Sequence, residues 1–214
     1  MSRYVVEDCT LPKPIAGHPA LELCNTIAMW GLPQEHDYLV DGHVLAVWAR
    51  ERGLVSQADQ PLADPTDVQL RDVKRLRQHL HDVVIAAEPE DLDLTAIHGL
   101  VASATRRASY KVSGARLTLV AADAGHLVVD RAALAVHDLL TSWGPAAVGH
   151  CGGEPCGWVF LDPAHRRRWC EMAVCGNRAK ARRYARRHQA LRDDGAGRGP
   201  RRSAAADNRK VSIA

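Results

Sequence analysis

Four of the six cysteines stand near the C-terminus in two equal pairs, Cys151 with Cys156 and Cys170 with Cys175. Each turn of two cysteines with four residues between them can bring two thiolates to one ion, and thirteen residues separate the two turns. Zinc prefers four soft ligands placed tetrahedrally, and a complete shell of sulfur suits a structural ion that is closed to substrate. The spacing therefore predicts one Zn²⁺ bound by these four cysteines.

Two disulfide bonds are the alternative interpretation of the same four residues. They would require an oxidising compartment, and the N-terminal stretch MSRYVVEDCTLPKP has neither an apolar core of signal-peptide length nor a small-residue cleavage site. No run of the sequence is long and apolar enough to cross a membrane. The sequence thus favours a cytoplasmic metalloprotein, in which Cys9 and Cys24 are free or buried thiols.

Charge divides the chain into two parts of opposite sign. Residues 1–150 contain 13 Lys and Arg against 19 Asp and Glu, whereas residues 151–214 contain 15 against 6. Positive charge gathered in a small segment suits a polyanionic partner, which an acidic body would repel. Nucleic acid is therefore expected to bind the C-terminal part.

The N-terminal part, residues 1–147, is predicted to fold as a mostly helical domain. Apolar residues recur there at helical spacing, with Asp41, Asp93 and Asp130 as candidate N-caps. The predicted helices cover residues 20–29, 41–53, 66–87, 93–104 and 130–143. The basic residues of the third helix are assigned to its solvated face; they are Arg71, Lys74, Arg75 and Arg77.

A short β-rich stretch interrupts this helical pattern. The runs 116–120 and 127–129 flank Asp123-Ala124-Gly125 and predict a small antiparallel hairpin, so the expected fold class is α+β. The histidines of this part have no Ser-His-Asp order, phosphate-binding glycine loop or His-Glu-x-x-His motif around them. They are assigned to the surface or to satisfied core positions, and an enzyme is not predicted.

Residues 148–192 form the predicted zinc finger, and residues 193–214 form a basic tail that is predicted to be disordered. The stretches 158–160 and 168–169 are expected to be two short strands that supply a small aromatic core. Because a module this small buries little apolar surface, metal binding should provide most of its folding free energy.

A helix from about residue 176 to residue 191 is expected behind the fourth cysteine. On a helical wheel its basic residues occupy a broad arc of about 200°, and three more arginines stand between the two cysteine pairs. Together they are the candidate nucleic-acid surface. Its members are Arg166, Arg167, Arg168, Arg178, Lys180, Arg182, Arg183, Arg186 and Arg187. A solvated basic face, or arginines that offset the charge of a zinc tetrathiolate, are the alternatives.

Two stretches of the sequence resemble known families. The string Cys175-Gly176-Asn177-Arg178, within RRWCEMAVCGNRAKAR, resembles the CGNR zinc finger of bacterial proteins. Residues 17–26, GHPALELCNT, resemble the opening motif of the ABATE domain, which usually precedes that finger. The resemblance implies a stress-responsive transcription regulator, with an α+β domain that senses a small-molecule effector and a treble-clef-like finger, built on four cysteines, that binds DNA.

The same resemblance implies roles for individual residues. The four paired cysteines become the zinc ligands, Asn177 is expected to brace the backbone near Cys175 rather than to contact a base, and Arg178 serves either purpose. The chain is thus expected to act on DNA of the nucleoid, with homo-oligomerisation left open. An RNA-binding or protein-binding finger is the alternative, and exposed Trp158 and Trp169 would favour single strands whereas buried ones would favour duplex DNA.

Overall fold

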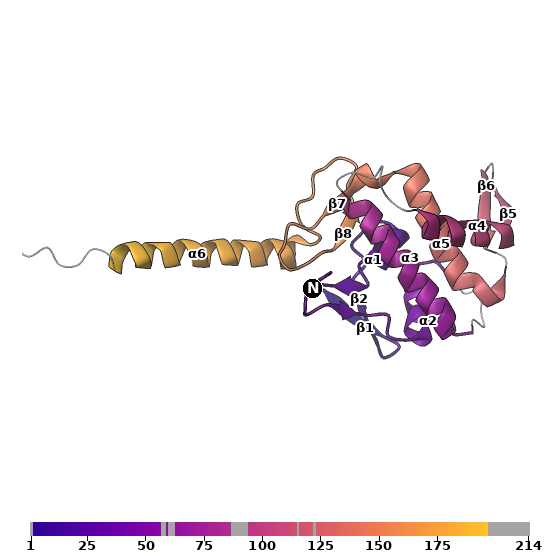
Figure 1. The fold of residues 1–214 in the computed structure, drawn as a ribbon, viewed down its shortest axis with the longest axis horizontal. Helices are drawn as coiled ribbons and strands as arrows, with labels where there is room; N and C mark the ends of the chain where they lie inside the picture. The colour runs from indigo at the N-terminus through magenta and orange to yellow at the C-terminus, as the bar shows by residue number, and fades with distance from the viewer. Residues whose placement is uncertain are drawn as a thin grey trace, which may run out of the picture.

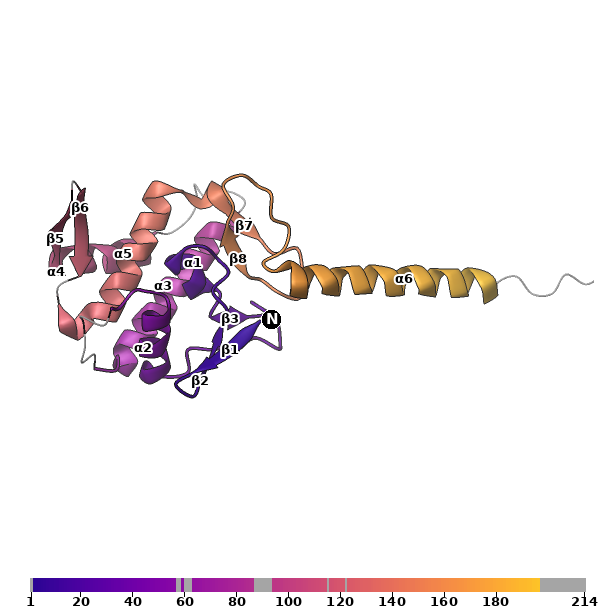
Figure 2. The same ribbon diagram turned by 180° about the vertical axis from the view of Figure 1, so that it is seen from behind.

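The computed structural model describes residues 2–56, 59, 63–86, 94–114, 116–121 and 123–196. Over these residues the chain is mostly helical and has four two-stranded antiparallel sheets, so the predicted α+β class is confirmed. Helices α1 to α5 and the sheets gather in one body, and α6 extends from it as a rod (Figure 1). The β5–β6 hairpin lies at the end of the body that is remote from α6, as the view from behind also shows (Figure 2).

The elements follow one another with short connections. The N-terminal part of the chain, called the N-terminal domain below, contains β1 (Arg3–Val6), β2 (Cys9–Pro12), α1 (Pro19–Cys24), β3 (Ile27–Ala28), β4 (His36–Asp37), α2 (Gly42–Glu51), α3 (Asp67–Ile85), α4 (Thr95–Arg107), β5 (Ala108–Ser113), β6 (Arg116–Ala121), η3 (Ala124–His126), α5 (Leu127–Ser142) and η4 (Pro145–Ala147). The C-terminal part contains β7 (Val148–His150), β8 (Val159–Leu161), the π-helical turn η5 (Met172–Gly176) and α6 (Asn177–Ala196). Each odd-numbered strand pairs with the next strand along the chain.

Side-chain caps lie at the start of α2 and of α3, close to the residues at which the sequence predicts these helices to begin. The Asp41 carboxylate accepts a hydrogen bond from the Val44 N–H at 2.8 Å at the start of α2, and Thr66 forms a capping box at the start of α3. Apolar side chains of α2, α3 and α5 then fill one core, in which Trp48, Leu80 and Leu139 are fully buried. None of the described helices combines the length and the apolar composition that are needed to cross a membrane.

Three predicted helix boundaries need correction or lie outside the described residues. The first helix ends at Cys24, because the chain turns at Asn25 and residues 27–28 form β3 instead of continuing the helix to residue 29. The proposed cap Asp93 lies outside the described residues, and α4 starts at Thr95. The C-terminal helix runs past residue 191 to Ala196, into the predicted disordered tail, and residues 197–214 lie outside the described part.

The predicted hairpin partner was wrong. The 116–120 run belongs to β6, but β6 pairs with the preceding β5 in the register Ser113 opposite Arg116, and Gly114, which follows β5, has φ +60°. Residues 127–129 instead form the first turn of α5, since their apolar side chains are buried there. Asp130 is therefore not an N-cap.

The environment of Asp130, in the first turn of α5, also differs from the expectation. Asp130 is fully buried inside the helix, where the Arg107 guanidinium donates hydrogen bonds to both carboxylate oxygens. Trp143 follows the last residue of α5 and is 47% exposed. The charge of Arg107 on α4 explains why an aspartate is tolerated among apolar neighbours.

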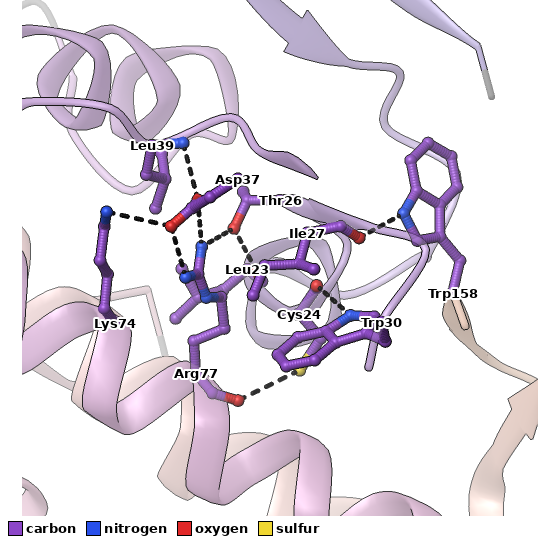
Figure 3. Close-up of polar contacts among 10 residues, drawn as sticks. All are labelled: Leu23, Cys24, Thr26, Ile27, Trp30, Asp37, Leu39, Lys74, Arg77 and Trp158. Carbon is purple, nitrogen blue, oxygen red and sulfur yellow. Dashed lines mark hydrogen bonds and ion pairs between the residues drawn. The ribbon is translucent and has the colours of Figure 1, made fainter. Parts of the chain in front are cut away.

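Arg77 is buried and does not lie on the solvated face of α3, to which the sequence assigned it. Its side chain is 3% exposed, and its guanidinium donates to both carboxylate oxygens of Asp37, at 2.7 and 2.8 Å, and to the Thr26 hydroxyl at 2.8 Å (Figure 3). Lys74 makes a second ion pair with Asp37 at 3.0 Å. Burial alone would raise the pKa of Asp37, but the Arg77 hydrogen bonds lower it below its ordinary value. This cluster fixes β4 on α3.

Replacing Arg77 by Met tests this cluster. The change leaves Asp37 with Lys74 alone and should lower the free energy of unfolding by about 3 kcal/mol, the lower end of the cost of removing one partner of a buried ion pair. Urea unfolding of the zinc-loaded protein measures the loss. Arg75→Met on the exposed side of α3 is the matched control and should change stability by less than about 0.5 kcal/mol. Equal losses of unfolding free energy in the two variants would show that the Arg77–Asp37 ion pair does not stabilise the fold more than an exposed arginine does.

Candidate metal centre

The first cysteine pair lies in the loop between β7 and β8, and the second pair frames the turn that leads into α6. The Cys151 N–H donates to the Trp158 carbonyl at 2.9 Å and closes the first loop. The Gly152 N–H donates to the Arg168 carbonyl at 2.9 Å and joins this loop to the segment of the second pair. The expected strand at residues 168–169 does not form, because β8 pairs with β7 instead. The treble-clef arrangement stays a prediction.

The four sulfur atoms meet at one point. All four Sγ atoms lie within 4.8 Å of one another, and the three distances among Cys156, Cys170 and Cys175 are 3.5 to 3.7 Å. A tetrahedral ion with Zn–S bonds of about 2.3 Å requires sulfur separations of about 3.8 Å, whereas a disulfide requires about 2.05 Å. All six cysteines are free thiols. The disulfide alternative was therefore wrong, and the donor set fits zinc.

The electrostatics of the cluster demand a cation. The Cys151 and Cys156 sulfurs, together with burial, raise the pKa of the Cys170 thiol, and the Cys151 sulfur raises the pKa of Cys156 to about 12. Four thiolates cannot share this volume without a positive ion at the centre, because each negative charge disfavours the next. Zinc binding must therefore displace protons, and the zinc affinity should rise with pH.

Side chains and backbone around the sulfurs stabilise their negative charge. The Cys170 N–H donates to the Cys151 Sγ at 3.3 Å, and Nη2 of Arg178 donates to the Cys175 Sγ at 3.1 Å. Asn177 donates from Nδ2 to the Ala173 carbonyl at 3.0 Å and braces the π-helical turn, as its predicted role requires. Arg178 thus supports the metal centre directly.

A glycine keeps space open at the centre. A Cβ atom on Gly153 would lie 2.9 Å from the Cys175 Cβ, 3.2 Å from the Cys175 Sγ and 3.4 Å from the Cys151 Sγ. Any side chain at this position would push a ligand out of place. Gly153 is therefore a functional residue that the spacing of the cysteines alone does not identify.

The N-terminal domain contacts the finger through Asn25, a polar residue near the end of the GHPALELCNT motif. The Asn25 side chain donates to the Val159 carbonyl and accepts from the Val159 N–H, both at 2.9 Å, so that it pairs with β8 as a neighbouring strand would. The Trp158 indole donates to the Ile27 carbonyl at 2.8 Å (Figure 3), and the Met29 N–H donates to the Cys156 carbonyl at 3.2 Å. Sequence reasoning missed this contact, although an asparagine in the apolar run LELCNT was its signal.

The nine predicted nucleic-acid residues divide into two groups. Arg178 contacts Cys175, and Arg167 donates to the carbonyls of Cys170 and Ile15, at 2.8 and 3.1 Å, with its guanidinium 4.1 Å from the Phe160 ring centre. The other seven are exposed, except for the half-buried Arg182; they are Arg166, Arg168, Lys180, Arg182, Arg183, Arg186 and Arg187.

Four of these arginines surround one small hollow. Its volume is about 210 Å³, and it lies between the first cysteine loop and α6. The lining includes Arg168, Arg182, Arg183 and Arg186, with Glu154 and Trp169 at its border. The metal centre fixes both walls of the hollow, because the loop carries Cys151 and Cys156 while α6 starts directly behind Cys175.

A helical domain joined to a four-sulfur metal centre with a basic helix defines a zinc-finger protein. Two family models match the chain in the order that its motifs predict: residues 17–143 match ABATE, described as "Putative stress-induced transcription regulator", and residues 148–188 match the CGNR zinc finger. The chain belongs to the ABATE family and carries a C-terminal CGNR zinc finger. A comparison with curated proteins finds no match.

Gly153→Ala tests the space at the metal centre. The added methyl group should displace Cys175 and weaken zinc binding by about tenfold, the lower range for changes next to metal ligands. Competition with a chromogenic chelator measures the affinity. Gly99→Ala is the matched control, because a Cβ at Gly99 meets nothing within 4 Å. Identical zinc affinities in the two variants would contradict the proposed crowding.

Zinc removal should loosen only part of the finger. Without the ion, residues 162–196 lose the four-sulfur anchor, whereas β8 keeps its contacts with Asn25 and with the Ala16 carbonyl, which accepts from the Leu161 N–H at 2.7 Å. Hydrogen exchange before and after chelation should show loss of protection at Cys175 and in α6 but retained protection at Val159 and Leu161. Unchanged protection in α6 would contradict this dependence on metal.

Proposed function

We propose that this protein is a DNA-binding transcription regulator that acts in the cytoplasm, on the nucleoid. The finger docks on duplex DNA through α6 and the arginine-lined hollow, and the N-terminal domain receives a signal or mediates assembly. The observation that carries the proposal is the hollow between the first cysteine loop and α6, where four arginines surround about 210 Å³. Arginine forks recognise phosphate oxygens by paired hydrogen bonds.

The basic residues exceed what the metal centre needs. A zinc ion with four thiolates carries a net charge of −2, and Arg167 and Arg178 already donate to the second cysteine pair or its backbone. Within the described residues, none of the other seven basic side chains forms an ion pair with a carboxylate. Their charge is therefore available to a polyanion, which argues against simple charge compensation.

The shape of α6 supports the same conclusion. The helix extends away from the acidic N-terminal body, so its arginines can approach a polyanion without bringing the acidic surface close (Figure 1). This arrangement also separates a binding part from a part that can receive a signal. The zinc centre joins the two parts, because it holds the root of α6 against the body.

Duplex DNA is favoured over single strands by the positions of the tryptophans. Trp158 is 1% exposed and donates its indole N–H to the Ile27 carbonyl, so it offers no stacking surface. Trp169 is half-buried, and the Arg168 guanidinium lies 5.0 Å from its ring centre. An RNA-binding finger remains the second candidate, since Tyr184 is 67% exposed on α6.

Salt dependence and charge reversal test the docking. Duplex affinity of the zinc-loaded protein, measured by fluorescence anisotropy, should fall with salt with a log–log slope of about −0.9 for each phosphate that is neutralised. The double variant Arg182→Glu/Arg186→Glu should bind at least about tenfold more weakly and have a shallower slope, because it loses two phosphate partners. An unchanged affinity would sink this mode of docking.

The control reverses one charge elsewhere. Lys111→Glu changes an exposed residue of β5, at the end of the body that is remote from α6, and should leave duplex affinity nearly unchanged. Competition with structured RNA and with single strands then separates the two candidate functions. Displacement of the duplex by a lower concentration of RNA than of DNA would favour the RNA-binding finger.

A further inference from the structure

A second pocket lies where three parts of the chain meet beside the metal centre. It has a volume of about 410 Å³ and is lined by the start of β1, by the β3–β4 pair and by the start of α6. The lining residues are Arg3, Ala28, Met29, His36, Tyr38 and Arg178. The N-terminal domain supplies all of them except Arg178, which belongs to the finger.

The chemistry of this pocket is that of a site for a small anion. Arg3 and Arg178 bring two permanent positive charges and His36 brings a ring nitrogen, while no carboxylate belongs to the lining. The Arg178 guanidinium uses Nη2 to donate to the Cys175 Sγ at 3.1 Å. Two guanidinium groups and an imidazole in one pocket without a carboxylate favour a carboxylate or phosphate.

The rest of the pocket restricts what the anion can be attached to. Ala28 and Met29 provide an apolar wall, and the His36 and Tyr38 rings meet edge to face, with 4.6 Å between their centres. A neighbouring hollow of about 660 Å³ shares Arg3, His36 and Tyr38 but is bordered by Glu7, Asp8 and Asp41. A ligand that reaches into it must carry an uncharged or cationic group there, because a second negative charge would meet these carboxylates.

We propose that this pocket binds a small carboxylate or phosphate compound whose other end is uncharged or cationic, and that this compound is the signal received by the N-terminal domain. The proposal deepens the regulatory function proposed above and rests on it for its biological meaning. The binding itself does not depend on DNA.

Arg178 links the pocket to the finger. Its guanidinium faces the pocket and at the same time neutralises part of the charge on Cys175, the last ligand before α6. An anion that engages Arg178 shares the positive charge of its guanidinium, so the Cys175 thiolate becomes less stabilised. Occupancy of the pocket should therefore change how firmly the metal and the root of α6 are held.

Calorimetric titration of the zinc-loaded full chain, without DNA, tests the binding. Benzoate and inorganic phosphate are the probes, and at least one should bind with a dissociation constant of about 1 mM or tighter, which corresponds to about −4 kcal/mol. Arg3→Gln and His36→Gln should each weaken that binding several-fold. Binding of neither probe at ten times that concentration would overturn the proposal.

Two controls locate the anion. Arg187→Gln removes the same charge from a residue that lines neither pocket and should leave probe binding unchanged. Arg182→Gln/Arg186→Gln should also leave it unchanged, because these residues line the other hollow. Probe binding that is lost in this double variant but kept in Arg3→Gln would place the anion in the DNA-facing hollow and overturn the proposal, even if DNA binding itself is confirmed.

A second readout tests the link to the metal. The bound probe should increase the rate at which a chelator removes zinc from the wild-type protein by at least about twofold, and it should have a smaller effect on Arg3→Gln. A zinc release rate that does not respond to the probe, in a protein that binds the probe, would overturn the role of Arg178. Duplex affinity without probe reports separately on the proposed function.

Discussion

The pairing between Asn25 and the backbone of β8 is the contact on which the arrangement of this molecule depends. The amide supplies one donor and one acceptor to Val159, which satisfies both backbone groups where no strand lies alongside. Unpaired, these buried groups would each cost about 1–3 kcal/mol. The finger is therefore built partly on the N-terminal domain, and its aromatic core, with Trp158 and Phe160, need not stabilise itself alone.

Local signals in the sequence predicted much of the fold and nearly all of the metal centre. The cysteine spacing identified the four ligands, the cap at Asp41 placed α2 and apolar spacing placed α3, because these features depend on residues a few positions apart. Long-range partners were not predictable in this way. Arg77 is buried because Asp37, forty residues earlier, accepts both of its nitrogens. The β6 run also carries no mark of whether its partner precedes or follows it.

The same distinction applies to the basic surface. The sequence placed most of the basic residues on the predicted C-terminal helix, but it treated all nine as one set. In three dimensions Arg167 and Arg178 are tied to the second cysteine pair, whereas Arg182, Arg183 and Arg186 border an open hollow. Proximity to the second cysteine pair decides between these roles, and a sequence pattern does not contain that information.

The length of α6 has a mechanical consequence. A helix of 20 residues is about 30 Å long, and this one projects from the body with its root beside Cys175 (Figure 1). It therefore acts as a lever arm: a tilt of about 10° at the root displaces the tip by about 5 Å, comparable to one turn of the helix itself. Small adjustments among sulfur ligands are thus amplified into shifts large enough to change which part of a partner molecule the tip can reach.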